Sequence, residues 1–160
     1  DTGRLDQVSR GVYTLPEVWE DEFVSIQERY KRGVFALDTA LFLHDLTDRT
    51  PHKFHMAFPY GYNTSSPKAA GILCSCKKEP YYSLGIALVD TPAGNTVRAY
   101  NAEKTLCEIL KPISHTDIQI ITDAFKRYAG RKDKNIPLLS EYAHQLRVEK
   151  RLRPYLEILL

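Results

Sequence analysis

The sequence has little of several features that would assign a protein to a class at once. Its 160 residues include only three cysteines, one methionine and one tryptophan, and the formal net charge at pH 7 is +2. Three cysteines form no disulfide framework and favour reduced thiols in a cytosolic protein. A net charge this small does not indicate a nucleic-acid partner, so such a partner has to be inferred from where the charges lie.

Long apolar runs and familiar catalytic motifs are also absent from the sequence. No stretch approaches the roughly 18 consecutive apolar residues of a membrane helix. The sequence contains no Gly-rich phosphate loop, no Gly-x-Ser-x-Gly elbow and no His-Glu-x-x-His zinc helix. No Asp or Glu is followed two residues later by Lys, a pairing typical of metal-dependent restriction nucleases. These absences predict a non-enzymatic protein with no membrane partner, no cofactor, no metal and no catalytic residues.

Composition and hydrophobic pattern favour a compact domain of the α+β class. Hydrophobic residues make up 43% of the chain and charged residues 26%. Apolar residues at helical spacing predict helices at 19–32, 37–46, 101–111, 114–130, 135–146 and 152–159. Runs rich in strand formers predict strands at 53–58, 71–78, 86–90 and 96–100. This order predicts a small mixed β-sheet with flanking helices and a helical C-terminal part.

Single residues predict where several helices begin, and one short segment predicts a turn. Asn101 and Asn135 suit the N-caps of two helices, and either Ser114 or Thr116 suits the N-cap of a third. The sequence TPAGN at 91–95 suits the turn of a β-hairpin. We therefore expect a hairpin that is followed at once by the first C-terminal helix.

Cys74 and Cys76, with His52 and His55, are residues with metal-ligand chemistry. Thiolate and imidazole both suit zinc. However, a Cys-x-Cys pair within a strand lacks the wider Cys-x-x-Cys turn of zinc sites, and the two histidines have no matching partner pair. Structural thiols are therefore the favoured interpretation.

His44 and Asp45 adjoin on an expected helix and resemble half of a general-base pair. No nucleophile lies within sequence reach of them. A packing or capping role is therefore favoured over a catalytic one.

Tyrosines are the aromatic residues that could stack on nucleic-acid bases. The candidates are Tyr60, Tyr62, Tyr81 and Tyr82. Packing within the protein is the favoured alternative for most of them. Tyr60 and Tyr62 lie in a polar loop and are the better candidates for stacking.

Basic residues gather in the C-terminal part of the chain. From residue 126 onward there are nine Lys and Arg against four Asp and Glu, so the rest of the chain is net negative. Clustered Lys and Arg release counterions when they bind a nucleic-acid backbone, and the alternative is an ordinary solvated helix face. The candidate DNA-binding or toxin-neutralising residues of this basic patch are Lys126, Arg127, Arg131, Lys132 and Lys134.

The start of the chain carries a second basic feature. Alternating apolar residues at 5–14 favour one or two short strands, with Arg4 and Arg10 beside them. In winged-helix proteins such a wing places arginines against DNA phosphates or in the minor groove. Because the chain opens at Asp1 inside this pattern, we expect the sequence to be a fragment of a longer protein.

Five stretches of the sequence resemble the antitoxins of the AbiEi family, which belong to bacterial type IV toxin–antitoxin systems of abortive infection. The likeness runs over nearly the whole chain, in the same order. The stretches are RGVYTLPEVWEDEF at 10–23, YKRGVFALDTALFLHDLTDRTP at 30–51, FPYGYNTSS at 58–66, TPAGNTVRAYNAEKTLCEIL at 91–110 and DAFKRYAGRKDKNIPLLSEYA at 123–143.

The resemblance implies an N-terminal winged helix-turn-helix that binds the promoter of its own operon, and a C-terminal α+β domain that counteracts an AbiEii-type nucleotidyltransferase toxin. By this likeness, residues 1–15 are the remnant of the wing, with Arg4 and Arg10, and residues 16–160 are the antitoxin domain. The implied partners are operator DNA, through the full-length protein, and the toxin or its target, and the implied location is the cytoplasm. A nucleic-acid-modifying enzyme with an unrecognised site and a stand-alone protein-interaction domain are the alternatives.

Overall fold

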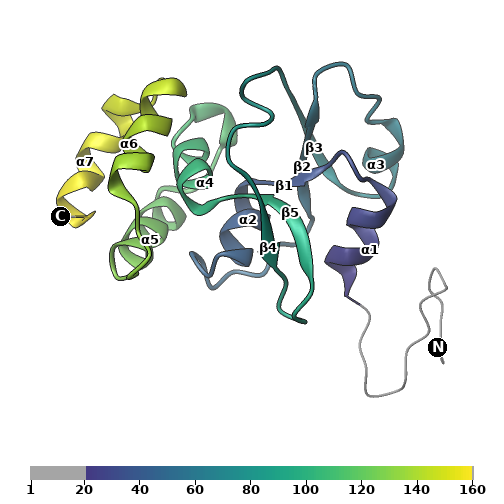
Figure 1. Cartoon of the computed structure of the whole chain (residues 1–160), viewed down its shortest axis with the longest axis horizontal. Coiled ribbons are helices and arrows are strands. Elements are labelled where there is room, and N and C mark those ends of the chain that lie inside the picture. Colours follow the sequence, from purple (N-terminus) through teal and green to yellow (C-terminus); the bar gives the residue numbers. More distant parts are fainter. Residues whose placement is uncertain (1–20, 160) are drawn as a thin grey trace.

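The computed structural model describes residues 21–159 (Figure 1). The expected wing strands, with Arg4 and Arg10, lie outside this range. In chain order the elements are α1 Glu22–Arg29, β1 Val34–Phe35, α2 Leu37–Leu43, β2 His55–Pro59, α3 Ser65–Ala69, β3 Leu73–Lys77, β4 Ile86–Asp90, β5 Thr96–Tyr100, α4 Ala102–Ile109, the 3-10 turn Pro112–Ser114, α5 Ile118–Ala129, α6 Ile136–Gln145 and α7 Glu149–Leu159. The fold is α+β with a mixed sheet and a helical C-terminal part, as the sequence predicts.

The five strands lie in the order β3-β2-β1-β5-β4. β1 pairs antiparallel with β2 and parallel with β5, β2 pairs parallel with β3, and β4 and β5 form the predicted antiparallel hairpin. β1, the central strand, is not predicted from the sequence, because a strand of two residues is too short to show an alternating pattern. Both of them, Val34 and Phe35, are fully buried.

Helices cover both faces of the sheet (Figure 1). α1 packs on one face, where Phe23 meets Phe35 edge to face with a ring-centroid distance of 5.4 Å. α4 lies on the opposite side, and all eight of its residues are buried, while Phe42 of α2 stacks on Phe23 of α1. α5, α6 and α7 pack beyond α4 around Leu106, Phe125 and Leu139. Because α4 lies between the sheet and the C-terminal helices, it is the element on which both parts of the core are built.

Most predicted helix boundaries are close to the observed ones, but the start of α5 is wrong and one short helix was not predicted. Asn101 and Asn135 cap α4 and α6 by accepting backbone N–H bonds, as predicted. α5 is instead capped by Asp117, whose carboxylate accepts from the N–H two residues later. The Ser114 hydroxyl is engaged before the helix begins, because it donates to the carbonyl of Ile109 and its oxygen accepts from the N–H and the hydroxyl of Thr116. The loop expected after β2 also contains the short helix α3. None of the helices within 21–159 combines the length and apolar character needed to cross a membrane.

Candidate nucleic-acid interface

The basic patch predicted from the sequence lies at the C-terminal end of α5 and in the turn that leads to α6. Within it, Nε of Arg127 lies 2.8 Å from Oδ2 of Asp123, one helical turn earlier. Both side chains are well exposed, so this pair stabilises the helix by only about 0.3–0.5 kcal/mol. Arg127 therefore remains accessible but is partly neutralised.

Arg131 links this turn to the end of another helix. Its Nε and Nη2 donate to the two carboxylate oxygens of Asp133 at 2.9 Å each, and its Nη1 donates to the carbonyl of His44 at 2.7 Å. His44 is the C-cap of α2, where the helix dipole favours a cation. The two-pronged pair raises the pKa of Arg131 and lowers that of Asp133. Arg131 therefore holds the α5–α6 turn against α2.

Lys134 is also engaged within the protein. Its Nζ donates to the carbonyl of Ala129 at 2.8 Å and to that of Leu159 at 3.5 Å, the last residues of α5 and α7. Lys126 and Lys132 are exposed and have no hydrogen-bond or ion-pair partner among residues 21–159. The structure thus brings the five predicted residues to one end of α5 but leaves only Lys126 and Lys132 with entirely free charges.

The residues with catalytic or metal-ligand chemistry occupy structural positions. His44 Nε2 lies 2.8 Å from the carbonyl of Tyr100, and burial lowers the pKa of this histidine. Cys74 is half-buried against the core that α1 covers, while Cys76 is exposed. Across residues 21–159, no three His, Cys, Asp or Glu side chains gather closely enough to hold a metal ion.

Only some of the candidate tyrosines have accessible rings. Tyr62 is only partly exposed, and one face of its ring is stacked on Phe58 at a centroid distance of 4.5 Å. Tyr82 is buried. Tyr60 and Tyr81 are 69% and 37% exposed. Tyr81 is the one of these two that lies beside a large hollow in the surface.

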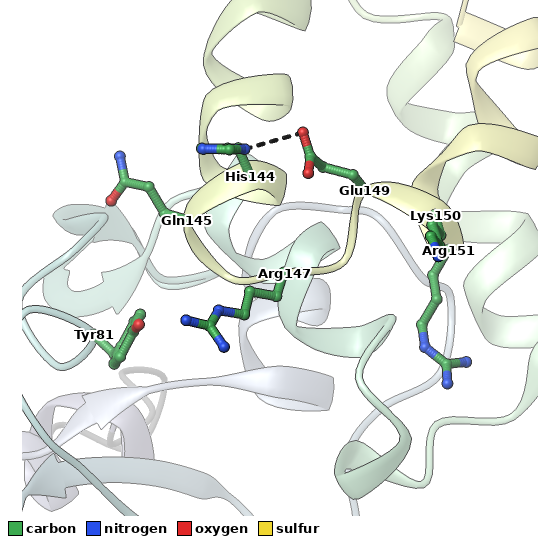
Figure 2. A pocket seen from close by; sticks show the side chains of 7 residues that line it. All are labelled: Tyr81, His144, Gln145, Arg147, Glu149, Lys150 and Arg151. Atoms are coloured by element: carbon green, nitrogen blue, oxygen red, sulfur yellow. Dashed lines mark hydrogen bonds and ion pairs between the residues drawn. The ribbon is translucent and has the colours of Figure 1, made fainter.

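A second basic surface surrounds this hollow, at the turn between α6 and α7 (Figure 2). The hollow has a volume of about 790 Å³ and is lined by Tyr81, His144, Gln145, Arg147, Glu149, Lys150 and Arg151. The three cationic side chains of the turn and of α7 are exposed, and no carboxylate within the described range pairs with them. The acidic member of the lining, Glu149, turns toward His144, with Oε2 3.2 Å from Nδ1 (Figure 2). The hollow is therefore basic and carries an aromatic ring on one wall.

The backbone at Arg147 is unusual for an arginine. Its φ of +61° lies in the left-handed region, which glycine adopts most readily. Its N–H bonds to the carbonyl of His144, and the N–H of Val148 bonds to that of Ala143. This pair of bonds defines a Schellman motif at the end of α6, with Arg147 at the position that is usually glycine. The turn directs the arginine side chain toward Tyr81 (Figure 2).

A buried lysine of α4 holds the loop that carries Tyr81. Nζ of Lys104 donates to the carbonyls of Tyr81 and Leu84, at 2.8 Å each, and lies 3.6 Å from Oε2 of Glu108. Burial lowers the pKa of Lys104 to about 8. Gly85, with a φ of +84°, lets the loop pass over this lysine, because a Cβ there would lie 2.7 Å from Cβ of Lys104. The backbone of Tyr81 is thus fixed relative to α4.

Sequence reasoning counted Arg147, Lys150 and Arg151 among the basic residues of the C-terminal part but did not select them. No short motif connects them with Tyr81, which lies far away in the sequence. A local signal was nevertheless present, since Arg147 follows a predicted helix at the place where glycine would be expected.

Comparison with known proteins adds no assignment to this geometry. No protein-family model matches the chain, and no sequence in the set of curated proteins matches it either. Any function has to be argued from the residues themselves and from the resemblance of particular stretches.

Proposed function

We propose that this chain is the antitoxin domain of a type IV toxin–antitoxin system of the AbiEi kind, and that it counteracts an AbiEii-type nucleotidyltransferase toxin in the cytoplasm. In this proposal the full-length protein also represses its own operon by binding operator DNA. The chain has no enzymatic role. The support for the proposal is the likeness of the five sequence stretches together with the way in which those stretches pack.

The observation that carries the proposal is that stretches far apart in the sequence build one core. The stretch at 91–110 forms β5 and α4, and the stretch at 123–143 forms most of α5 and α6. They meet where the Tyr128 hydroxyl donates to Oε2 of Glu103 at 2.6 Å, a buried hydrogen bond. A likeness confined to surface turns could reflect turn chemistry alone, whereas a likeness in segments that pack together supports a common fold.

The basic surfaces give this proposal a physical means of action. A type IV antitoxin opposes its toxin at the toxin's target, and the substrates of nucleotidyltransferases and the operator are both rich in phosphate. Free cations such as Lys126 and Lys132 suit contacts with a phosphate backbone, which gain from counterion release. A direct complex with the toxin is the second mechanism compatible with the proposal.

Co-expression with the neighbouring nucleotidyltransferase gene tests the antitoxin proposal. We expect the chain to restore growth of cells that are arrested by the toxin. The informative variant is Lys126→Glu with Lys132→Glu, since these lysines have no structural contact to lose. Lys31→Glu with Lys53→Glu is the matched control, because both of these lysines are exposed elsewhere on the surface.

Two outcomes contradict parts of the proposal. Soluble accumulation of the chain without restored growth contradicts antitoxin activity. Equal rescue by the Lys126/Lys132 variant and the control contradicts a role for the α5–α6 patch. Affinity capture of the toxin on the tagged chain then separates a direct complex from action at the target.

A further inference from the structure

The hollow at the α6–α7 turn combines two kinds of group that act together in single-strand recognition. Exposed Lys and Arg side chains attract a phosphate backbone, and an exposed aromatic ring offers a face on which an unpaired base can stack. Arg147, Lys150 and Arg151 supply the first, and Tyr81 supplies the second. The volume of about 790 Å³ is within the range of about 300–1,000 Å³ that is usual for small-ligand sites.

The side chain of Arg147 has no polar partner within the described chain. Its guanidinium makes no hydrogen bond or ion pair among residues 21–159, yet its backbone occupies a conformation that disfavours every residue with a Cβ. Figure 2 shows the side chain extended from the turn toward Tyr81, across the hollow.

Tyr81 is prepared for stacking by the contacts behind it. Its carbonyl is held by Lys104, and Nζ of Lys111 lies 5.8 Å from the centroid of its ring. Lys111 is not among the residues that line the hollow. A residue whose backbone is already held in place loses less conformational entropy when a base stacks on its ring.

We propose that this hollow binds single-stranded nucleic acid, with one base stacked on Tyr81 and the neighbouring phosphates held by Arg147, Lys150 and Arg151. A duplex keeps its bases paired and stacked on each other, so it cannot use the tyrosine face. This site is separate from the α5–α6 patch, and its ligand can be tested without any toxin. A failure to rescue growth would therefore not contradict single-strand binding at this hollow, and a failure to bind single strands would not contradict antitoxin activity.

Fluorescence anisotropy with labelled oligonucleotides of about 12 nucleotides tests the site, since small single-strand binding domains cover about 4–16 nucleotides. The probes are oligo(U) RNA, oligo(dT) DNA and a duplex DNA of equal length, each titrated with the whole 160-residue chain. We expect one or both single strands to bind more tightly than the duplex. The ratio of the RNA and DNA affinities identifies which strand the site prefers.

Two variants distinguish the contribution of base stacking to single-strand affinity from the contribution of charge. Tyr81→Ala should weaken single-strand binding on the order of tenfold, because stacking on an aromatic ring is worth about 1–3 kcal/mol per base, while Tyr81→Phe should retain it. Arg147→Gly should weaken binding and lower the slope of log K against log salt by about 0.7, the value for one lost phosphate contact on a single strand. Glycine suits the left-handed turn, so this variant keeps the fold.

Two control variants exclude the effects on binding that any glycine in such a turn, or any loss of a positive charge, would have. Asp45→Gly places a glycine in the Schellman turn that ends α2, where Asp45 has a φ of +58°, and should leave binding unchanged. Arg153→Ala removes an exposed charge of α7 that does not line the hollow and should have a smaller effect than Arg147→Gly. Tighter binding of the duplex, no loss with Tyr81→Ala, or equal losses with Arg153→Ala and Arg147→Gly would each overturn the proposal.

Discussion

The two basic turns at either end of α6 look alike in the sequence but differ in the structure. In the α5–α6 turn, Arg131 and Lys134 donate to carbonyls at the ends of α2, α5 and α7. In the α6–α7 turn and the first turn of α7, Arg147 and Arg151 have no such partner among residues 21–159. Arg131 and Arg147 each directly follow a helix C-cap, so the difference is that the side chain of Arg131 reaches a carbonyl at the end of another helix. The basic character of a segment therefore does not by itself identify a binding surface.

Lys104 is the extreme case of an internal cation, and its loss should have the largest effect on stability. Lys104→Met removes one of two cationic partners of Glu108, which keeps Lys77 at 3.0 Å, and leaves the carbonyls of Tyr81 and Leu84 without this donor. Losing two charged hydrogen bonds from a buried lysine costs about 3 kcal/mol, which urea denaturation measures. Lys111→Met is the control, with an expected loss below about 1 kcal/mol, since Lys111 is only partly buried. Similar losses for both variants would contradict the structural role of Lys104.

The effects of Arg131→Ala and Arg151→Ala on the free energy of unfolding compare the two basic regions directly. Arg131→Ala should lower the free energy of unfolding by about 2 kcal/mol, because it removes a charged hydrogen bond to the carbonyl of His44 and the pair with Asp133. Arg151→Ala should change it by less than about 0.5 kcal/mol, as for most exposed residues. Urea denaturation of both variants measures the difference. If Arg151→Ala were equally destabilising, the contrast between an internal and a free turn would be wrong.

The sequence predicts the features of this fold that depend on neighbouring residues, but not those that depend on distant ones. The hairpin of β4 and β5 and the caps Asn101 and Asn135 were predictable, since they depend on neighbouring residues. The central strand β1 was not, because it is defined by pairing with distant strands. The roles of Arg131 and Tyr81 were not predictable for the same reason. Their partners, the end of α2 and the turn after α6, reach them only through the tertiary fold.

The ionisation of Lys104 should also make the free energy of unfolding depend on pH, and this effect is smaller than that of Lys104→Met. Burial lowers the pKa of Lys104 from 10.5 to about 8, so above pH 8 the unfolded chain binds more protons here than the folded one. Lys104 alone then makes stability rise with pH, by about 1 kcal/mol between pH 8 and 9. Cys107 opposes this rise from about pH 8 upward, because its thiol ionises with a pKa of 9.0 in the unfolded chain while burial raises that pKa to about 12 in the folded state, so the net rise is about 0.6 kcal/mol.

Urea denaturation at pH 7, 8 and 9 measures this rise, and NMR titration of the lysine side chains locates the group responsible. We expect one lysine to titrate near pH 8 in the folded protein. A flat or falling free energy of unfolding between pH 8 and 9 would contradict a charged, buried Lys104.

Arg147→Gly should change stability by a small amount, opposite in sign to the losses expected for Lys104→Met and Arg131→Ala. Relieving a left-handed residue that has a Cβ gains about 1–2 kcal/mol, and the extra freedom of glycine in the unfolded chain costs about 0.5–1 kcal/mol. A net gain of about 1 kcal/mol is expected, measurable as a higher midpoint in urea. Asp45→Gly should gain less, because aspartate tolerates this conformation better than arginine does. A variant that is more stable and yet binds single strands more weakly would show that the strain at Arg147 serves the ligand; a destabilised one would show that the arginine supports the fold, and the contrast between the two turns would fail.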